Sequence, residues 1–123
     1  MTSSMLTYIF AVNDIAEQGK PVRSVDIAAR LRVARASVCK ALDRLTDAGY
    51  ALRDDFNFVR LTAQGREVVE LYEPAYLFLT DMLADKLGLP RVRAANEALA
   101  VAGALSADCI KRINEYAIGV TEG

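Results

Sequence analysis

The chain has 123 residues, of which 53% are hydrophobic and 25% charged, and its formal net charge is −1. This is an ordinary globular composition, and the length fits one domain or one domain with a small helical extension. No apolar run approaches the ~18 residues of a membrane-spanning helix, no signal peptide is evident, and the two cysteines predict no disulfide framework, so we expect a cytoplasmic protein with no membrane partner.

The first predicted helix extends from about Met5 to Gln18, with one of the two serines before it as its cap. Its apolar residues form a wide stripe at helical spacing, whereas Phe10 lies outside the stripe and suggests a second contact surface. Gly19 and Pro21 end this helix, and a very short strand is predicted at Val22.

The segment from Ser24 to Gly65 predicts a helix-turn-helix followed by a small β-wing. Ser24 is expected to cap a first short helix, and a second helix is expected from Arg35 to Asp47, where Gly49 closes it. One face of the second helix is apolar. The other face is small, basic and hydroxyl-bearing, which suits the major groove of DNA, and it carries Arg35, Ala36, Ser37, Lys40, Asp43 and Arg44.

The wing is predicted from two short alternating runs, residues 50–53 and 58–61, joined by a turn that is rich in Asp and Asn. Thr62 is expected to cap the next helix. Between Lys20 and Arg60 the chain has nine Lys or Arg residues and five Asp residues, so positive charge is concentrated in this part of an otherwise acidic protein. That asymmetry is typical of a DNA-binding module, although Asp54 and Asp55 at the wing tip would weaken contacts with phosphate.

The rest of the chain predicts only helices. One long helix is kinked at Pro74, or two helices meet there, and Pro90 opens an alanine-rich helix to Ala104. Ser106 is expected to cap a last helix that ends near Ile118. The abundance of apolar residues indicates a homodimer interface, although an intramolecular bundle is the alternative. We therefore predict a mostly α fold with a small β-wing, comprising a winged-helix DNA-binding domain at residues 1–72 and a helical dimerisation region at residues 73–123.

The chain resembles the iron- and manganese-dependent repressors, the diphtheria-toxin-repressor family. The residues that carry the resemblance are Tyr8-Ile9, Val25-Asp26-Ile27-Ala28, Leu31, Ser37-Val38, Leu42, Leu45, Gly49-Tyr50, Leu61-Thr62 with Gly65, and Leu105-Ser106. The resemblance covers nearly the whole chain and implies a winged helix followed by a dimerisation region, without a third domain.

The resemblance fails at the places where that family binds its regulatory metal. The matching positions are Thr7, Phe10, about Pro74, and about Leu99, Ala102 and Gly103, and the chain has no His. Of these side chains only the Thr7 hydroxyl offers a ligand atom, whereas a transition-metal site needs imidazole, thiolate or several convergent carboxylates. We therefore predict no metal site and no cofactor.

Taken together, the sequence predicts a metal-independent winged-helix transcriptional regulator, most simply a repressor, that binds a pseudo-palindromic double-stranded operator as a homodimer. The predicted DNA-binding residues are Arg35, Ala36, Ser37, Lys40, Arg44 and Arg53. No catalytic constellation is evident, so we do not expect an enzyme. Two alternatives remain open: a winged-helix protein-interaction module without specific DNA binding, and a regulator that responds to a small apolar molecule bound near Phe10.

Overall fold

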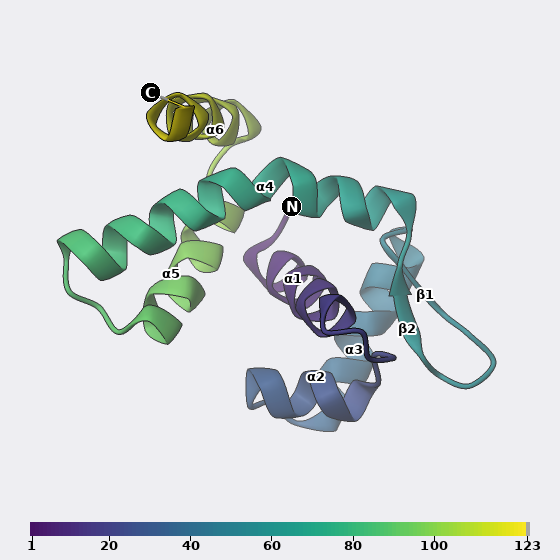
Figure 1. The fold of residues 1–123 in the computed structure, drawn as a ribbon. Helices are drawn as coiled ribbons and strands as arrows, with labels where there is room; N and C mark the ends of the chain where they lie inside the picture. Colours follow the sequence, from purple (N-terminus) through teal and green to yellow (C-terminus); the bar gives the residue numbers. More distant parts are fainter. Residues whose placement is uncertain (123) are drawn as a thin grey trace. The chain divides into compact units, whose positions relative to one another are not determined.

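The protein is described here by a computed structural model that covers residues 1–122, with side chains up to residue 119 (Figure 1). The fold is mostly helical with one small antiparallel sheet, as the sequence predicts. In chain order the elements are α1 (Ser3–Glu17), α2 (Ser24–Leu31), α3 (Arg35–Asp47), β1 (Ala51–Arg53), β2 (Val59–Leu61), α4 (Ala63–Asp81), the π-helix η1 (Met82–Lys86), α5 (Arg91–Ala104) and α6 (Ala107–Glu122). Within the described residues, no helix is long and apolar enough to cross a lipid bilayer.

The chain divides into two compact units, and the boundary between them lies inside α4. One unit is Ser4–Val69 and the other combines Met1–Ser3 with Glu70–Gly123. The first unit contains most of α1, the helix-turn-helix, the wing and the start of α4, and the second contains the rest of α4 with η1, α5 and α6.

The unit Ser4–Val69 is built around α1, which is buried along most of its length. Phe10 is only 3% exposed, so it contributes to the packing of the single chain and does not form the second contact surface that the sequence suggested. The fully buried side chains of α2 and α3 complete this core, namely Ile27, Val38, Leu42 and Leu45. The apolar face predicted for α3 is therefore confirmed.

The N-terminus of α2 differs from the prediction. Ser24 is the first helical residue and Arg23 occupies the cap position. The Asp26 carboxylate accepts a hydrogen bond from the Arg23 backbone N–H at 3.3 Å. Because Asp26 reaches back to bond the backbone of the cap residue, the helix begins one residue earlier than a serine cap would allow.

An ion pair ties α1 to α2. Asp14 accepts a hydrogen bond from the Arg30 guanidinium at 2.8 Å. Burial raises the pKa of Asp14 above its ordinary value, and the charge and hydrogen bond of Arg30 offset only part of this effect. The folded protein consequently binds a proton at Asp14 more tightly than the unfolded chain does.

We expect the Asp14 carboxyl to make stability depend on pH in a defined direction. Its raised pKa contributes stability that is fully present below the unfolded pKa and is lost as the pH rises through the folded pKa. The free energy of unfolding of the wild type should therefore decline relative to that of Asp14→Asn between about pH 3 and pH 7. Urea unfolding of both proteins across this range checks the result, and a difference that stays constant with pH would contradict it.

In the other unit, α4 continues through Pro74 as one helix, which decides between the two predicted alternatives. Proline has no N–H to donate, so the carbonyl four residues before it, that of Glu70, loses its helical donor. The Asn114 side chain of α6 donates to the carbonyl of the next residue, Leu71, at 2.6 Å. The side chain of Asn114 thus fixes α6 against α4 beside the proline.

The connector after α4 is held by one arginine. The helix loosens into the π-helix η1, and Arg91 then bonds Asp81 at 2.8 Å and Asp85 at 3.3 Å. Helix α5 begins after Pro90 as predicted, and its alanines 94, 98 and 102 are fully buried. Ser106 caps α6 as predicted, because its hydroxyl accepts from the Cys109 N–H at 3.1 Å.

Candidate nucleic-acid interface

Helix α3 begins and ends at the predicted residues, and the side chains predicted to read DNA lie on its surface. Arg35, Ala36, Ser37, Lys40 and Arg44 are all exposed, whereas the apolar face of α3 is buried. One side of α3 therefore presents three cations together with small side chains. This combination permits close approach to a duplex and offers donors for base edges and phosphates.

The N-terminus of α3 is also open. Its cap residue is Ala34, which makes no side-chain hydrogen bond to the first turn. Backbone N–H groups of a first turn that have no side-chain cap are a favourable place for a phosphate. Arg32, which adopts a left-handed conformation with φ of 56° in the turn before α3, is exposed close to this end in sequence. The sequence pattern of α3 does not mark Arg32 as a candidate DNA contact. Its position in the turn between the two helices is the signal that would mark it.

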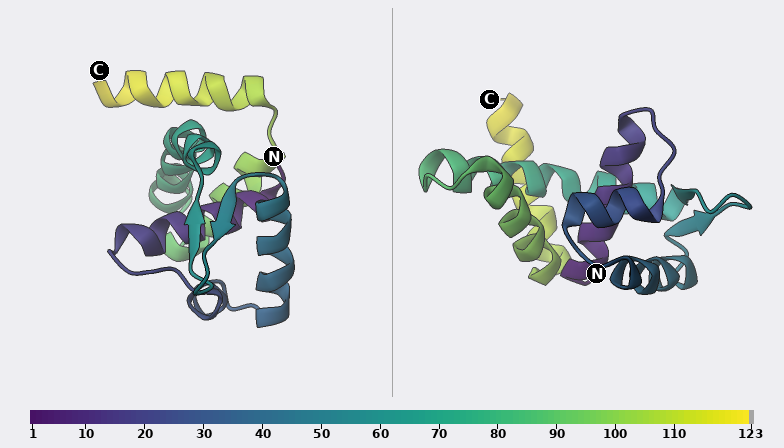
Figure 2. Two further views of the ribbon diagram at one scale, coloured as in Figure 1. Left: turned by 90° about the vertical axis from the view of Figure 1, so that its right-hand side faces the viewer. Right: turned by 90° about the horizontal axis from the view of Figure 1, so that it is seen from below.

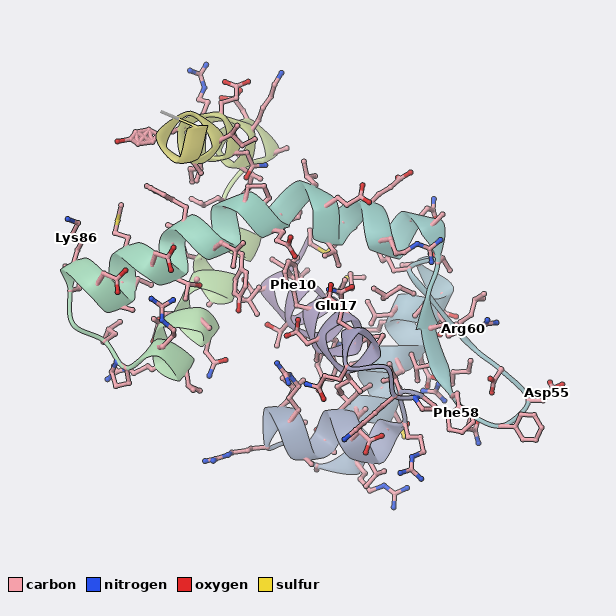
Figure 3. All side chains as sticks on the ribbon, in the orientation of Figure 1. Phe10, Glu17, Asp55, Phe58, Arg60 and Lys86 are labelled. Carbon is pink, nitrogen blue, oxygen red and sulfur yellow. The ribbon has the colours of Figure 1, made fainter. Side chains whose placement is uncertain are left out.

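The wing is a short antiparallel hairpin in which Ala51 pairs with Leu61 and Arg53 with Val59. Asp54 shapes its turn, since its carboxylate accepts from the Phe56 N–H at 2.8 Å and the Phe58 N–H at 3.0 Å. Figure 3 shows Asp55 at the outer end of the loop and Arg60 on the strand behind it. Asp54 is thus engaged in the turn, and Asp55 carries the exposed acidic charge of the tip.

Val22 forms an isolated bridge with Val59, which is the very short strand predicted there. The exit from the wing is closed by Thr62. Its hydroxyl donates to the Gly49 carbonyl at 2.6 Å and accepts from the Gly65 N–H at 3.1 Å. One threonine therefore caps α4, as predicted, and joins it to the end of α3.

Arg53 lies in a different setting from the predicted residues on α3. Its side chain is 29% exposed, and its guanidinium donates to the Cys39 carbonyl at 3.3 Å and lies 3.5 Å from the Asp43 carboxylate. Both partners belong to α3. The hairpin lies beside α3 in both views of Figure 2. The structure therefore joins Arg53 to α3, a connection that no local sequence pattern indicates.

The positions that would hold a metal in the related repressors do not fit one in this chain. Phe10, Leu99 and Ala102 are buried apolar residues, and Pro74 and Gly103 have no ligand atom in their side chains. Among the residues that the structure describes, no group of three His, Cys, Asp or Glu side chains is placed to hold a metal ion. The donor set that a transition metal requires is therefore missing from these positions.

Comparison with known proteins gives a match for the N-terminal part. Residues 1–53, which include α1, α2, α3 and β1, match the iron dependent repressor N-terminal DNA binding domain. A search of curated protein sequences finds no match.

Solved structures with the same fold cover almost the whole chain. The manganese regulator SloR has a TM-score of 0.77 at 17% identity, over 94% of this chain and 54% of that one. IdeR from T. acidophilum has a TM-score of 0.64 at 23% identity, over 94% of this chain and 53% of that one. A hypothetical protein from Sulfolobus solfataricus has a TM-score of 0.64 at 18% identity, over 94% of this chain and 88% of that one. The chain spans about half the length of the first two.

These likenesses extend the fold beyond the matched domain, and the domain match itself confirms the resemblance drawn from the sequence. Over residues 1–53, which are less than half of its length, the chain is similar to the N-terminal DNA-binding domain of the iron dependent repressors.

Proposed function

We propose that the protein is a transcriptional repressor that binds a pseudo-palindromic operator as a homodimer and needs no metal to do so. The observation that carries the proposal is the exposed cationic face of α3, presented by a domain similar to a DNA-binding domain. Arg35, Ser37 and Lys40 near its N-terminal end are the proposed contacts to base edges and phosphates. Ala36 permits close approach, and Arg44 is proposed to bind phosphate.

The helical unit that begins at Glu70 supports the homodimer. Large apolar side chains that one copy leaves exposed include Leu71, Leu77, Met82, Val92, Tyr116 and Ile118. A groove of about 660 Å³ is lined partly by Pro74, Leu77 and Phe78 of α4 and by Ala117 and Ile118 of α6. An exposed apolar surface of this kind marks an interaction site, and a symmetric dimer is the commonest way to cover one. Residues 73–123 are therefore the proposed dimerisation region.

Metal independence is proposed from the donor chemistry. SloR and the regulator MtsR are described as a manganese regulator and a metal-dependent regulator. In this chain, the positions matching the family's metal ligands offer apolar side chains, a proline, a glycine and the Thr7 hydroxyl, which is a weak ligand. These side chains carry no charge, so they can be buried without a bound metal ion to neutralise them. The binding-competent geometry is therefore proposed to persist in the absence of metal.

Selection of bound duplexes from random DNA, with and without a chelator, tests the proposal. We expect the same two-fold symmetric sequence to be enriched in both arms, with affinity that falls steeply as salt rises. Enrichment only in the arm without chelator would contradict metal independence. Enrichment in neither arm would contradict DNA binding and favour the protein-interaction module.

A further inference from the structure

Arg53 bridges the wing and the recognition helix. From β1 its guanidinium reaches the Cys39 carbonyl at 3.3 Å and the Asp43 carboxylate at 3.5 Å, which are one helical turn apart on α3. The Nε atom of Arg53 is buried without a hydrogen-bond partner among the described atoms. The guanidinium end of the side chain is therefore held at α3 and is not extended into solvent.

Asp43 is the acidic partner of Arg53 on α3. Its side chain is 71% exposed and lies one turn after Lys40 and Cys39 on α3, next to Arg44. A carboxylate on a helix that approaches DNA repels the phosphates, and a guanidinium beside it cancels much of that field. An ion pair this exposed adds little to the stability of a fold. Its effect is therefore on the charge and the position of α3 relative to the wing.

We propose that Arg53 is a positioning residue for DNA recognition, which holds the wing against α3 and neutralises Asp43, so that this pair sets the discrimination between operator and other DNA. The inference rests on the proposed function and refines it. Arg53 acts through α3 and does not contact phosphate itself. A released Arg53 would add a phosphate contact that is blind to sequence.

Arg53→Gln separates positioning from phosphate contact. Positioning predicts that binding to the selected operator weakens about tenfold more than binding to a scrambled duplex, because the repulsion from the uncovered Asp43 acts on both duplexes alike. A phosphate contact predicts instead that both duplexes lose affinity together and that the slope falls by about one. Arg60→Gln is the matched control, because Arg60 lies on the same hairpin and is exposed. It should leave the operator-to-scrambled ratio unchanged.

Asp43→Asn provides the second arm and removes only an exposed charge. It removes the repulsion and frees Arg53 to meet a phosphate, so binding to both duplexes should tighten, with a salt slope steeper by about one. Because the freed Arg53 no longer holds the wing against α3, the operator should gain about tenfold less affinity than the scrambled duplex, and the operator-to-scrambled ratio should fall. In Asp43→Asn/Arg53→Gln the two effects on this ratio should not add, as expected of residues in contact.

The outcomes distinguish this inference from the proposed function. A wild-type protein that binds neither duplex in a salt-dependent way would overturn the proposed function. A wild-type protein that prefers its operator, combined with equal losses on both duplexes in Arg53→Gln, would overturn the positioning role alone. An unchanged ratio in Asp43→Asn would also overturn the positioning role, and this variant answers the question even if Arg53→Gln folds poorly.

Discussion

Replacing Arg35 and Lys40 together with alanine is expected to abolish specific binding to the operator and to leave the fold and the oligomeric state unchanged. Both side chains are exposed on α3, so their removal creates no cavity. A good contact to a base edge contributes about 1–3 kcal/mol of discrimination, so two lost contacts weaken operator binding by about a hundredfold or more. Fluorescence anisotropy with the selected operator at fixed salt measures the loss.

The control for this double variant is Lys111→Ala with Arg112→Ala on α6. It removes the same charge from exposed positions in the other unit. We expect it to change operator affinity by no more than a few-fold, because neither residue belongs to the recognition helix or the wing. Sedimentation of both variants reports the oligomeric state. Operator affinity that survives in Arg35→Ala/Lys40→Ala would remove the assignment of α3 as the recognition helix.

The helix-turn-helix could be predicted closely because its signals are local. The apolar spacing of Val38, Leu42 and Leu45 gave the inward face of α3, and all three are fully buried. Gly49 has φ of 86°, so the residue type alone marked the end of that helix. Asn57 has φ of 62°, which is the left-handed geometry that an Asp- and Asn-rich turn predicted.

Features that depend on residues far apart in the chain could not be predicted from the sequence. The hydrogen bond from the Asn114 side chain to the Leu71 carbonyl joins α6 to α4, and the apolar periodicity of neither helix predicts it. The contact of Arg53 with α3 also joins distant parts of the chain. From the sequence alone, an arginine in a short strand is expected to be a solvated cation. The cap of α2 failed for a different reason. Ser24 and Asp26 are both residue types that bond backbone groups at a helix N-terminus, and in the structure it is Asp26 that bonds the N–H of the cap residue Arg23.

Gly65 provides the second large effect, since the structure leaves no room for a side chain there. A Cβ at Gly65 would collide with the backbone carbonyl of Tyr50 and would lie 3.2 Å from Leu61. The Tyr50 carbonyl accepts from the Thr62 N–H at 3.0 Å, and the Tyr50 N–H donates to the Leu45 carbonyl at 2.9 Å. Displacing Tyr50 therefore disturbs both the wing exit and the end of α3.

We expect Gly65→Ala to destabilise the protein by about 2–5 kcal/mol, from overpacking against rigid backbone and from hydrogen bonds that are lost or lengthened. Gly119→Ala is the matched control: the position is helical, and apart from its own helix no atom of the described residues lies within 4 Å of a Cβ there. It should be neutral or stabilising by up to about 1 kcal/mol, because alanine is the better helix former. Chemical unfolding of the two variants measures the difference. Equal stabilities of the two variants would contradict this prediction. They would mean that the backbone at Tyr50 moves to accommodate the new methyl group at no cost, so that the contact of Gly65 with Tyr50 does not fix the end of α3.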